Sequence, residues 1–128
     1  MSSPTFSILV VDDDPSNAGV LADILDAKGF RVHAVTSGAE ALAILRDHPV
    51  NILLTDVKMP GMNGLELYRA ARQLHPELVT ILMSAYAADD LIRQGLQEGI
   101  KTVLNKPLDI DFLLMLISAY TSISLKKG

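Results

Sequence analysis

The stretch FSILVVDDDP, residues 6–15, joins a continuous apolar run to an acidic end. Four apolar residues in a row, Ile8 to Val11, favour a strand buried on both faces, as in a parallel sheet. Asp12 and Asp13 follow at once, Asp14 is placed to cap a helix, and Pro15 suits the first position of that helix. This stretch therefore predicts a buried strand, an acidic turn and a helix.

The same alternation of a short apolar run with a segment of helical period occurs five times along the chain. The expected strands are residues 6–11, 31–35, 50–55, 79–83 and 102–104. The expected helices are residues 15–28, 38–46, 64–75, 88–98 and 109–125, to within a few residues. Five such units predict right-handed crossovers and a doubly wound α/β fold, with a parallel five-stranded sheet between two helical layers.

Composition limits the classes of function. The chain has 128 residues, 49% of them hydrophobic, which suits one domain with a sizeable core. Its net charge of −4 argues against direct binding to nucleic acid or to an anionic membrane. With no cysteine there is no disulfide, thiolate nucleophile or zinc ribbon. No secretory signal and no apolar run of about 18 residues is present, so a cytoplasmic protein is expected.

The candidate functional residues follow the expected strands. In open α/β sheets, ligands bind at the carboxyl ends of the strands. Four of the five expected strands are followed there by chemically useful side chains, namely Asp12 and Asp13, Asp56, Ser84 and Lys106. These residues are therefore expected to form one site.

Three of these residues are carboxylates that converge if the strand order is 2-1-3-4-5, as in flavodoxin-like folds. Three like charges cannot all stay ionised without help, so either a pKa rises or a cation binds. An all-oxygen donor set suits Mg²⁺, which points to phosphoryl chemistry. Asp56, alone at its strand end before an open Pro-Gly turn, is expected to be the nucleophile. Lys106 and Ser84 would bond the transferred group.

At four places the sequence resembles the receiver domain of two-component response regulators. The matching stretches are VVDDDP (10–15), TDVKMPGMNG (55–64), Ser84-Ala85 and Asn105-Lys106-Pro107, and the resemblance covers about residues 6 to 123 of a single domain expected over 1–128. It implies a phosphorelay in which Asp56 accepts a phosphoryl group from a phosphohistidine, on a histidine kinase or a histidine phosphotransfer protein.

The resemblance also implies roles for the neighbours of Asp56. Asp12 and Asp13 would bind Mg²⁺ directly or through water, with the backbone carbonyl of Lys58 as a further ligand, and Ser84 and Lys106 would bond the phosphoryl oxygens. A cis peptide is implied at Lys106-Pro107. The domain would catalyse its own phosphorylation and dephosphorylation, while its output would be binding of a downstream protein or an output domain.

One position departs from the family pattern. Three residues before the lysine the family often has an aromatic ring that swings inward on activation, but this chain has Val103. The signal from Ser84 must then pass through backbone shifts of the following loop, or Tyr86 takes over part of the role of the ring. Lys58 and Tyr86 are expected to flank the phosphorylation site and to set the access of water.

The last expected helix carries six consecutive apolar residues, 112–117, which surround its axis. Only one face can meet the sheet, so an exposed patch for a partner is expected, with a homodimer through the fourth helix, fifth strand and fifth helix as one form. The alternative is a helix that lies under the termini. Met83 and Met115 are expected in the core.

Two other functions stay open. In a haloacid-dehalogenase-like phosphohydrolase, which also uses an aspartyl phosphate, Asp12 would be the nucleophile. In a degenerate receiver the domain would bind partners without being phosphorylated. Whether an output domain follows residue 128 in the natural protein is open as well.

Overall fold

The computed structural model describes residues 6–85 and 90–127, with side chains as far as residue 121. Its strands are β1 (Ser7–Val11), β2 (Arg31–Val35), β3 (Ile52–Asp56), β4 (Val79–Ser84) and β5 (Thr102–Asn105). Its helices are α1 (Pro15–Ala27), α2 (Gly38–Asp47), α3 (Gly64–Leu74), α4 (Asp90–Gln97) and α5 (Ile110–Lys127). The predicted alternation of five strands with five helices is confirmed.

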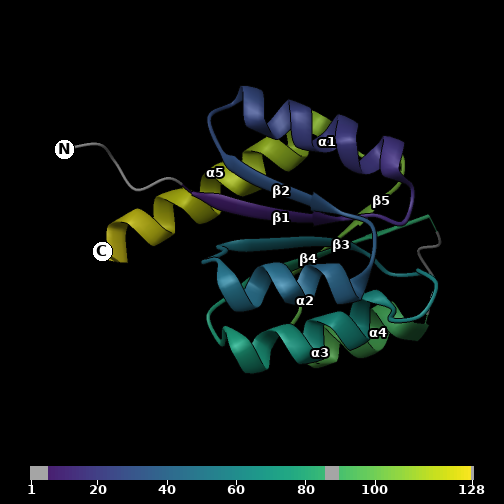
Figure 1. The fold of residues 1–128 in the computed structure, drawn as a ribbon. Helices are drawn as coiled ribbons and strands as arrows, with labels where there is room; N and C mark the ends of the chain where they lie inside the picture. The colour runs from purple at the N-terminus through teal and green to yellow at the C-terminus, as the bar shows by residue number, and fades with distance from the viewer. Residues whose placement is uncertain (1–5, 86–89, 128) are drawn as a thin grey trace.

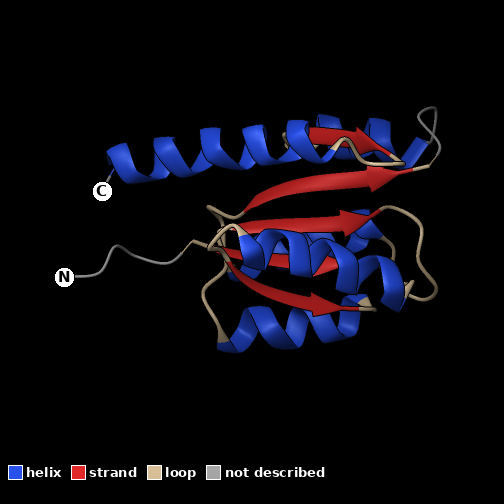
Figure 2. Cartoon of the chain, turned by 90° about the horizontal axis from the view of Figure 1, so that it is seen from above, coloured by secondary structure: helices blue, strands red, loops and turns tan. Residues whose placement is uncertain are grey.

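The five strands form one parallel sheet in the order β2-β1-β3-β4-β5. Helices α1 and α5 cover one face of the sheet, and α2, α3 and α4 cover the other (Figure 1). All five arrows point the same way in Figure 2, so the carboxyl ends of the strands meet at one edge. The predicted doubly wound, three-layer fold is thus confirmed, and with it the single edge at which a site was expected.

Burial explains why the central strands are continuous apolar runs. Every residue of β1 and of β3 is buried, because helices pack against both faces of the sheet there. The edge strand β2 is only partly buried. The two strands that end at the acidic residues are therefore buried along their whole length.

Local signals set the ends of the helices. The carboxylate of Asp14 caps α1 by accepting from the amide of Ser16, as the sequence predicted. Ser37 caps α2, and Asn63 forms a capping box with Glu66 at α3. The Lys106-Pro107 peptide is cis, which agrees with the expectation from the resemblance.

Small differences from the predicted bounds matter at the site. Asp56 and Ser84 are the last residues of β3 and β4 rather than the first residues after them. The strand pairing continues through them, with Asp56 opposite Met83 and Ser84 opposite Asn105. Backbone hydrogen bonds of the sheet therefore fix both residues directly.

The core prediction for methionine was right at one position and wrong at the other. Met83 is buried in the cluster between the sheet, α1 and α5, but Met115 is 59% exposed. Helix α5 turns Leu113 and Ile117, one helical turn apart, toward the sheet, so Met115 midway between them points outward. Phe112 is also exposed. The predicted exposed apolar side chains on the last helix are therefore present.

Within the described residues, no helix is both long and apolar enough to span a membrane.

Candidate functional site

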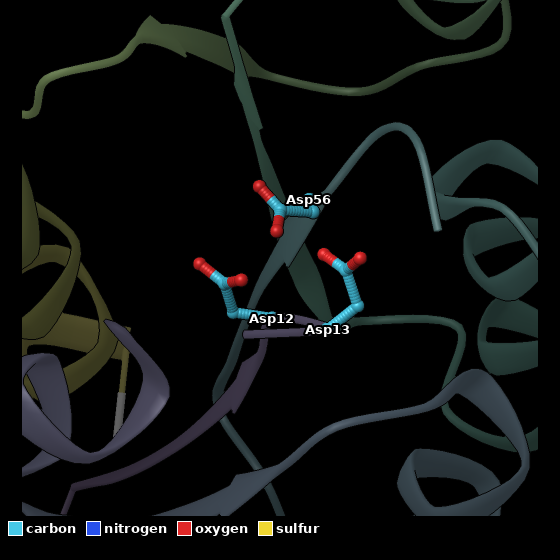
Figure 3. A group of neighbouring side chains, drawn as sticks. All are labelled: Asp12, Asp13 and Asp56. Atoms are coloured by element: carbon cyan, nitrogen blue, oxygen red, sulfur yellow. The ribbon is translucent and has the colours of Figure 1, made fainter. Parts of the chain in front are cut away.

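Three carboxylates converge at the carboxyl ends of β1 and β3, as predicted. Asp12 and Asp13 directly follow β1, and Asp56 ends β3. The three side chains point toward a common space (Figure 3), and one oxygen from each lies within 4.8 Å of the others. Asp12 and Asp56 are buried, whereas Asp13 is exposed. Within the described part of the chain, no other three His, Asp or Glu side chains offer ligand atoms this close together.

Backbone contacts hold the two buried carboxylates in place. The Asp12 amide donates to the carbonyl of Val35 at 3.2 Å, and its Oδ1 accepts from the Asp14 amide at 2.9 Å. On the other strand, the hydroxyl of Thr55 donates to the carbonyl of Asp56 at 3.0 Å. Sequence reasoning missed this threonine, although a polar side chain in an otherwise apolar run was a usable signal. The carboxylates are thus presented by rigid strand ends.

Lys106 joins the cluster from the segment after β5. Its Nζ lies 2.6 Å from Asp56 Oδ1 and 3.0 Å from Asp12 Oδ2. The Lys106 amide donates to the carbonyl of Ser84 at 2.8 Å, which links the ends of β4 and β5. Lys106 therefore pairs with two of the three carboxylates at once.

The charges of the cluster perturb one another. Burial raises the pKa of Asp56 to about 7, and the adjoining Asp12 carboxyl adds to this, while Lys106 opposes it. Burial also acts to raise the pKa of Asp12. Hydrogen bonds with Asp56, the Asp14 amide and Lys106 outweigh this effect, so the pKa of Asp12 is lowered. Burial disfavours the ammonium of Lys106, yet its bonds to both carboxylates raise its pKa. The two buried carboxyls therefore hold one proton between them more readily than two isolated aspartates would.

The remaining predicted residues lie around this cluster. Ser84 is buried at the end of β4, on the same edge of the sheet. Lys58 is exposed in the segment that follows Asp56. Val103 is half-buried and packs with the apolar cluster between the sheet, α3 and α4. Tyr86 lies outside the described residues.

An apolar groove opens beside the cluster. It has a volume of about 530 Å³ and borders both Asp12 and Lys106. Its walls come from Val20 and Ile24 of α1 and from Pro107 and Leu108 after β5. Of the three carboxylates, Asp12 is the one that lines this groove.

Chemically, the arrangement combines buried carboxylates, an all-oxygen ligand set and an ammonium group. This set can form an acyl phosphate and neutralise its charge. It contains no imidazole or thiol, so it suits a hard cation such as Mg²⁺ rather than zinc.

Comparisons with known protein families and sequences agree with this chemistry. A model of the response regulator receiver domain matches residues 8–118. The chain is 34% identical over 127 residues to the transcriptional regulatory protein ZraR of Klebsiella oxytoca, covering 97% of this chain and 29% of ZraR. It is 34% identical over 119 residues to the sensor histidine kinase RcsC of Salmonella typhimurium, covering 93% of this chain and 13% of RcsC. The chain thus spans less than a third of the length of either relative.

A solved structure gives the same result for the fold. The chain superimposes on the crystal structure of a CheY-like response regulator receiver domain protein from Methanospirillum hungatei JF-1 with a TM-score of 0.91. The two chains are 30% identical, and the match covers 98% of this chain and 100% of the other.

Proposed function

The chain belongs to the response regulator receiver domain family, the receivers of two-component phosphorelay signalling, and on that premise we propose that Asp56 is its phosphoryl acceptor. The observation that carries this assignment is the meeting of Asp56, Asp12, Asp13 and Lys106 at one edge of the sheet. Asp56 is the member that ends a separate strand and faces the other three groups.

In the proposed reaction, a carboxylate oxygen of Asp56 attacks the phosphorus of a phosphohistidine on a histidine kinase or a histidine phosphotransfer protein. An O–P bond forms as the N–P bond breaks, and the electron pair of the broken bond goes to the imidazole nitrogen. The product is an acyl phosphate on Asp56. The apolar groove beside Asp12 and Lys106 supports a protein donor, because it offers an apolar surface next to two side chains that adjoin Asp56.

The ligands for a metal are the carboxylates of Asp12, Asp13 and Asp56 and the backbone carbonyl of Lys58. The first three offer oxygens within 4.8 Å of one another, which fits the all-oxygen preference of Mg²⁺. When bound, Mg²⁺ supplies positive charge to the phosphoryl oxygens and to the crowded carboxylates. Asp13 is exposed, so its carboxylate can bind a hydrated ion, and it stays solvated when no ion is bound.

Lys106 and Ser84 complete the proposed site. The ammonium of Lys106 is already 2.6 Å from Asp56, so it needs little movement to pair with an oxygen of the transferred phosphoryl group. Ser84 ends the neighbouring strand β4, and its hydroxyl is assigned to a second phosphoryl oxygen. Phosphorylation would then draw Lys106 and Ser84 together and change the surface nearby. The catalysis of its own phosphorylation and dephosphorylation belongs to the same proposal.

The output is proposed to be protein binding at the surface formed by α4, β5 and α5. Exposed apolar side chains support this: Phe112 and Met115 on α5 are 43% and 59% exposed, and Leu96 on α4 is 50% exposed. The partner is a downstream protein, an output domain or a second copy of the chain. A single receiver domain over 1–128, a cytoplasmic location and the lack of direct nucleic-acid binding stay predictions.

Intact-mass measurement tests the acceptor. The wild type, Asp56→Asn and Asp12→Asn are incubated with Mg²⁺ and acetyl phosphate, with Asp47→Asn as a control for loss of an exposed carboxylate elsewhere. We expect the wild type and Asp47→Asn to gain one phosphoryl group and Asp56→Asn to gain none.

The same experiment separates the other hypotheses. An unlabelled wild type favours the degenerate receiver. Labelling of Asp56→Asn together with loss of labelling in Asp12→Asn favours the phosphohydrolase with Asp12 as nucleophile.

A further inference from the structure

The segment from Val57 to Asn63 leads from the acceptor to α3 and carries the carbonyl proposed as a metal ligand. It is held at its start by two backbone bonds: the Val57 amide donates to Met83 at 3.0 Å, and the Val57 carbonyl accepts from Gly64 at 2.8 Å. Farther along, Met59 and Met62 pack against the apolar cluster beneath α2 and α3. We call residues 57–63 the acceptor loop.

Gly64, the buried first residue of α3, lies against the backbone of the acceptor itself. A Cβ at this position would overlap the carbonyl oxygen of Asp56 and lie 3.0 Å from the Cα of Val57. Both are backbone atoms at the end of a buried strand, so no rotation of a side chain relieves the overlap. Any larger residue must move either α3 or the start of the acceptor loop.

Gly38, the buried first residue of α2, lies against the other end of the loop. A Cβ there would come within 2.7 Å of Met62 Sδ and 2.9 Å of Met62 Cβ. Rotation can move the sulfur, but the Met62 Cβ moves only with its backbone. Neither glycine has a positive φ, so close approach, and not backbone conformation, is what these positions require.

We propose that Gly38 and Gly64 are positioning residues for phosphoryl transfer, which seat the acceptor loop so that Asp56 and the Lys58 carbonyl meet the metal ligands after β1. The inference rests on the proposed function, in which the cluster binds Mg²⁺. It adds that two helix starts, from two different βα units, set the geometry of that cluster without touching the substrate. The capping box at Asn63 and Glu66 keeps α3 starting at this point.

The test measures Mg²⁺ affinity by calorimetry without a phosphodonor, and thermal unfolding followed by circular dichroism, for Gly64→Ala and Gly38→Ala. Gly95→Ala is the matched control, because a Cβ there also meets buried atoms, but these are the ends of the Ile100 and Leu82 side chains and not backbone atoms of the acceptor loop. Gly19→Ala is the control for helix propensity, since a Cβ there meets nothing within 4 Å.

We expect Gly64→Ala to weaken Mg²⁺ binding by about tenfold or more, as removal of supporting contacts does at other metal sites. Gly38→Ala should weaken it less, since part of the contact is with a flexible side chain. Gly95→Ala should lower the unfolding temperature while leaving Mg²⁺ affinity within about twofold, because the side-chain ends of Ile100 and Leu82 can move without moving the loop backbone. A Gly64→Ala protein that binds Mg²⁺ like the wild type overturns the proposal.

A second comparison decides the matter if Gly64→Ala does not fold. Gly38→Ala is measured again in a Met62→Gly background, where the Cβ, Cγ and sulfur that a Cβ at Gly38 would meet are all gone. Coupling through Met62 predicts a smaller loss of Mg²⁺ affinity there than in the wild type. Equal losses in both backgrounds contradict the inference. Mg²⁺ binding and labelling by the wild type test the proposed function separately.

Discussion

Two clusters of charged side chains among the described residues differ in how their carboxylates are compensated. At the site, the ammonium of Lys106 pairs with two of three neighbouring carboxylates, and the pKa of Asp56 is raised to about 7. The Glu98 cluster, defined as Tyr68, Arg69, Arg72 and Glu98, joins α3 to the end of α4. There Arg69 binds both oxygens of Glu98, at 2.9 and 2.6 Å, and its hydrogen bond lowers the pKa of Glu98.

The contrast shows what each cluster is suited to do. In the Glu98 cluster the backbone is satisfied too, because Tyr68 and Arg72 donate to the Glu98 carbonyl at 2.7 and 3.0 Å. The Glu98 carboxylate there is fully paired by Arg69, and Arg72 is hydrogen-bonded to the backbone, so the cluster fastens two helices. At the site the carboxylates outnumber the ammonium that pairs with them, which favours binding of a cation. Incompletely compensated carboxylates therefore mark the functional cluster, and the following predictions test that distinction.

The largest effect on stability is expected from Lys106→Met. Removal of the cation that pairs with Asp12 and Asp56 leaves two neighbouring buried carboxylates without this counter-charge. We expect the metal-free protein to lose about 3 kcal/mol of unfolding free energy at pH 8, measured by urea denaturation with EDTA. Saturating Mg²⁺ should restore a large part of the loss, because it returns positive charge to the same oxygens. A loss that is unaffected by Mg²⁺ would contradict this view of the cluster.

A gain in stability is expected from Asp56→Asn. The pKa of Asp56 is higher in the folded chain than in the unfolded chain. The protonated carboxyl therefore contributes fully to the free energy of unfolding below about pH 4, and this contribution is lost as pH rises through 7. The asparagine variant cannot ionise. Without metal it should therefore match the wild type near pH 4 and exceed it by about 2 kcal/mol at pH 8. Thermal unfolding across this range gives the measurement, and a constant difference at all pH values would refute the assignment.

A smaller loss is expected when the Glu98 cluster loses the hydroxyl of Tyr68, which donates to the Glu98 carbonyl and accepts a longer bond from Arg72. Tyr68→Phe removes the hydroxyl that donates to the Glu98 carbonyl but keeps the ring in place. The cost should be about 1 kcal/mol, typical of one hydrogen bond with a part-buried partner. Because the Glu98 cluster is expected to have only a structural role, the variant should be phosphorylated by acetyl phosphate at the rate of the wild type. A slower rate would show that the Glu98 cluster also affects the site.

The smallest effect is expected from Glu98→Gln. Its ion pair with Arg69 lies at the surface and is screened by salt, so the loss of stability should be slight. The loss should vanish in about 1 M salt, where screening acts over a few ångströms. Because the pKa of Glu98 is lowered by folding, its contribution is present above the ordinary glutamate pKa and fades as pH falls below it. Melting curves in low and high salt check both statements.

The carboxylate cluster at the site could be predicted from the sequence, whereas the Glu98 cluster could not. Repeated βα units place all strand ends at one edge, so the topology alone brings Lys106 to Asp12 across 94 positions. Arg69 and Glu98 are 29 positions apart, and no periodic pattern relates a residue inside α3 to one beyond the end of α4. The pairing depends on how the two helices pack, and packing has no local signature.

Two further features were beyond the sequence for related reasons. Six apolar residues in a row do not indicate which side of a helix meets the sheet, so Met115 was expected in the core and is exposed. The close approach of Gly38 to Met62 depends on how two separate βα units pack against each other, which the sequence pattern does not specify. The sequence could therefore predict which side chains gather around Asp56, but not the close contacts of Gly38 and Gly64 that hold the loop after it.

The pairing of Lys106 with Asp12 and Asp56 has a consequence for biosynthesis. A nascent chain that has passed residue 56 already contains the acidic side chains, yet it lacks the ammonium group and strand β5 until residue 106 has left the ribosome. Incomplete translation products therefore cannot present the assembled centre, and only polypeptides that are synthesised almost to the end of the domain become competent to receive a signal.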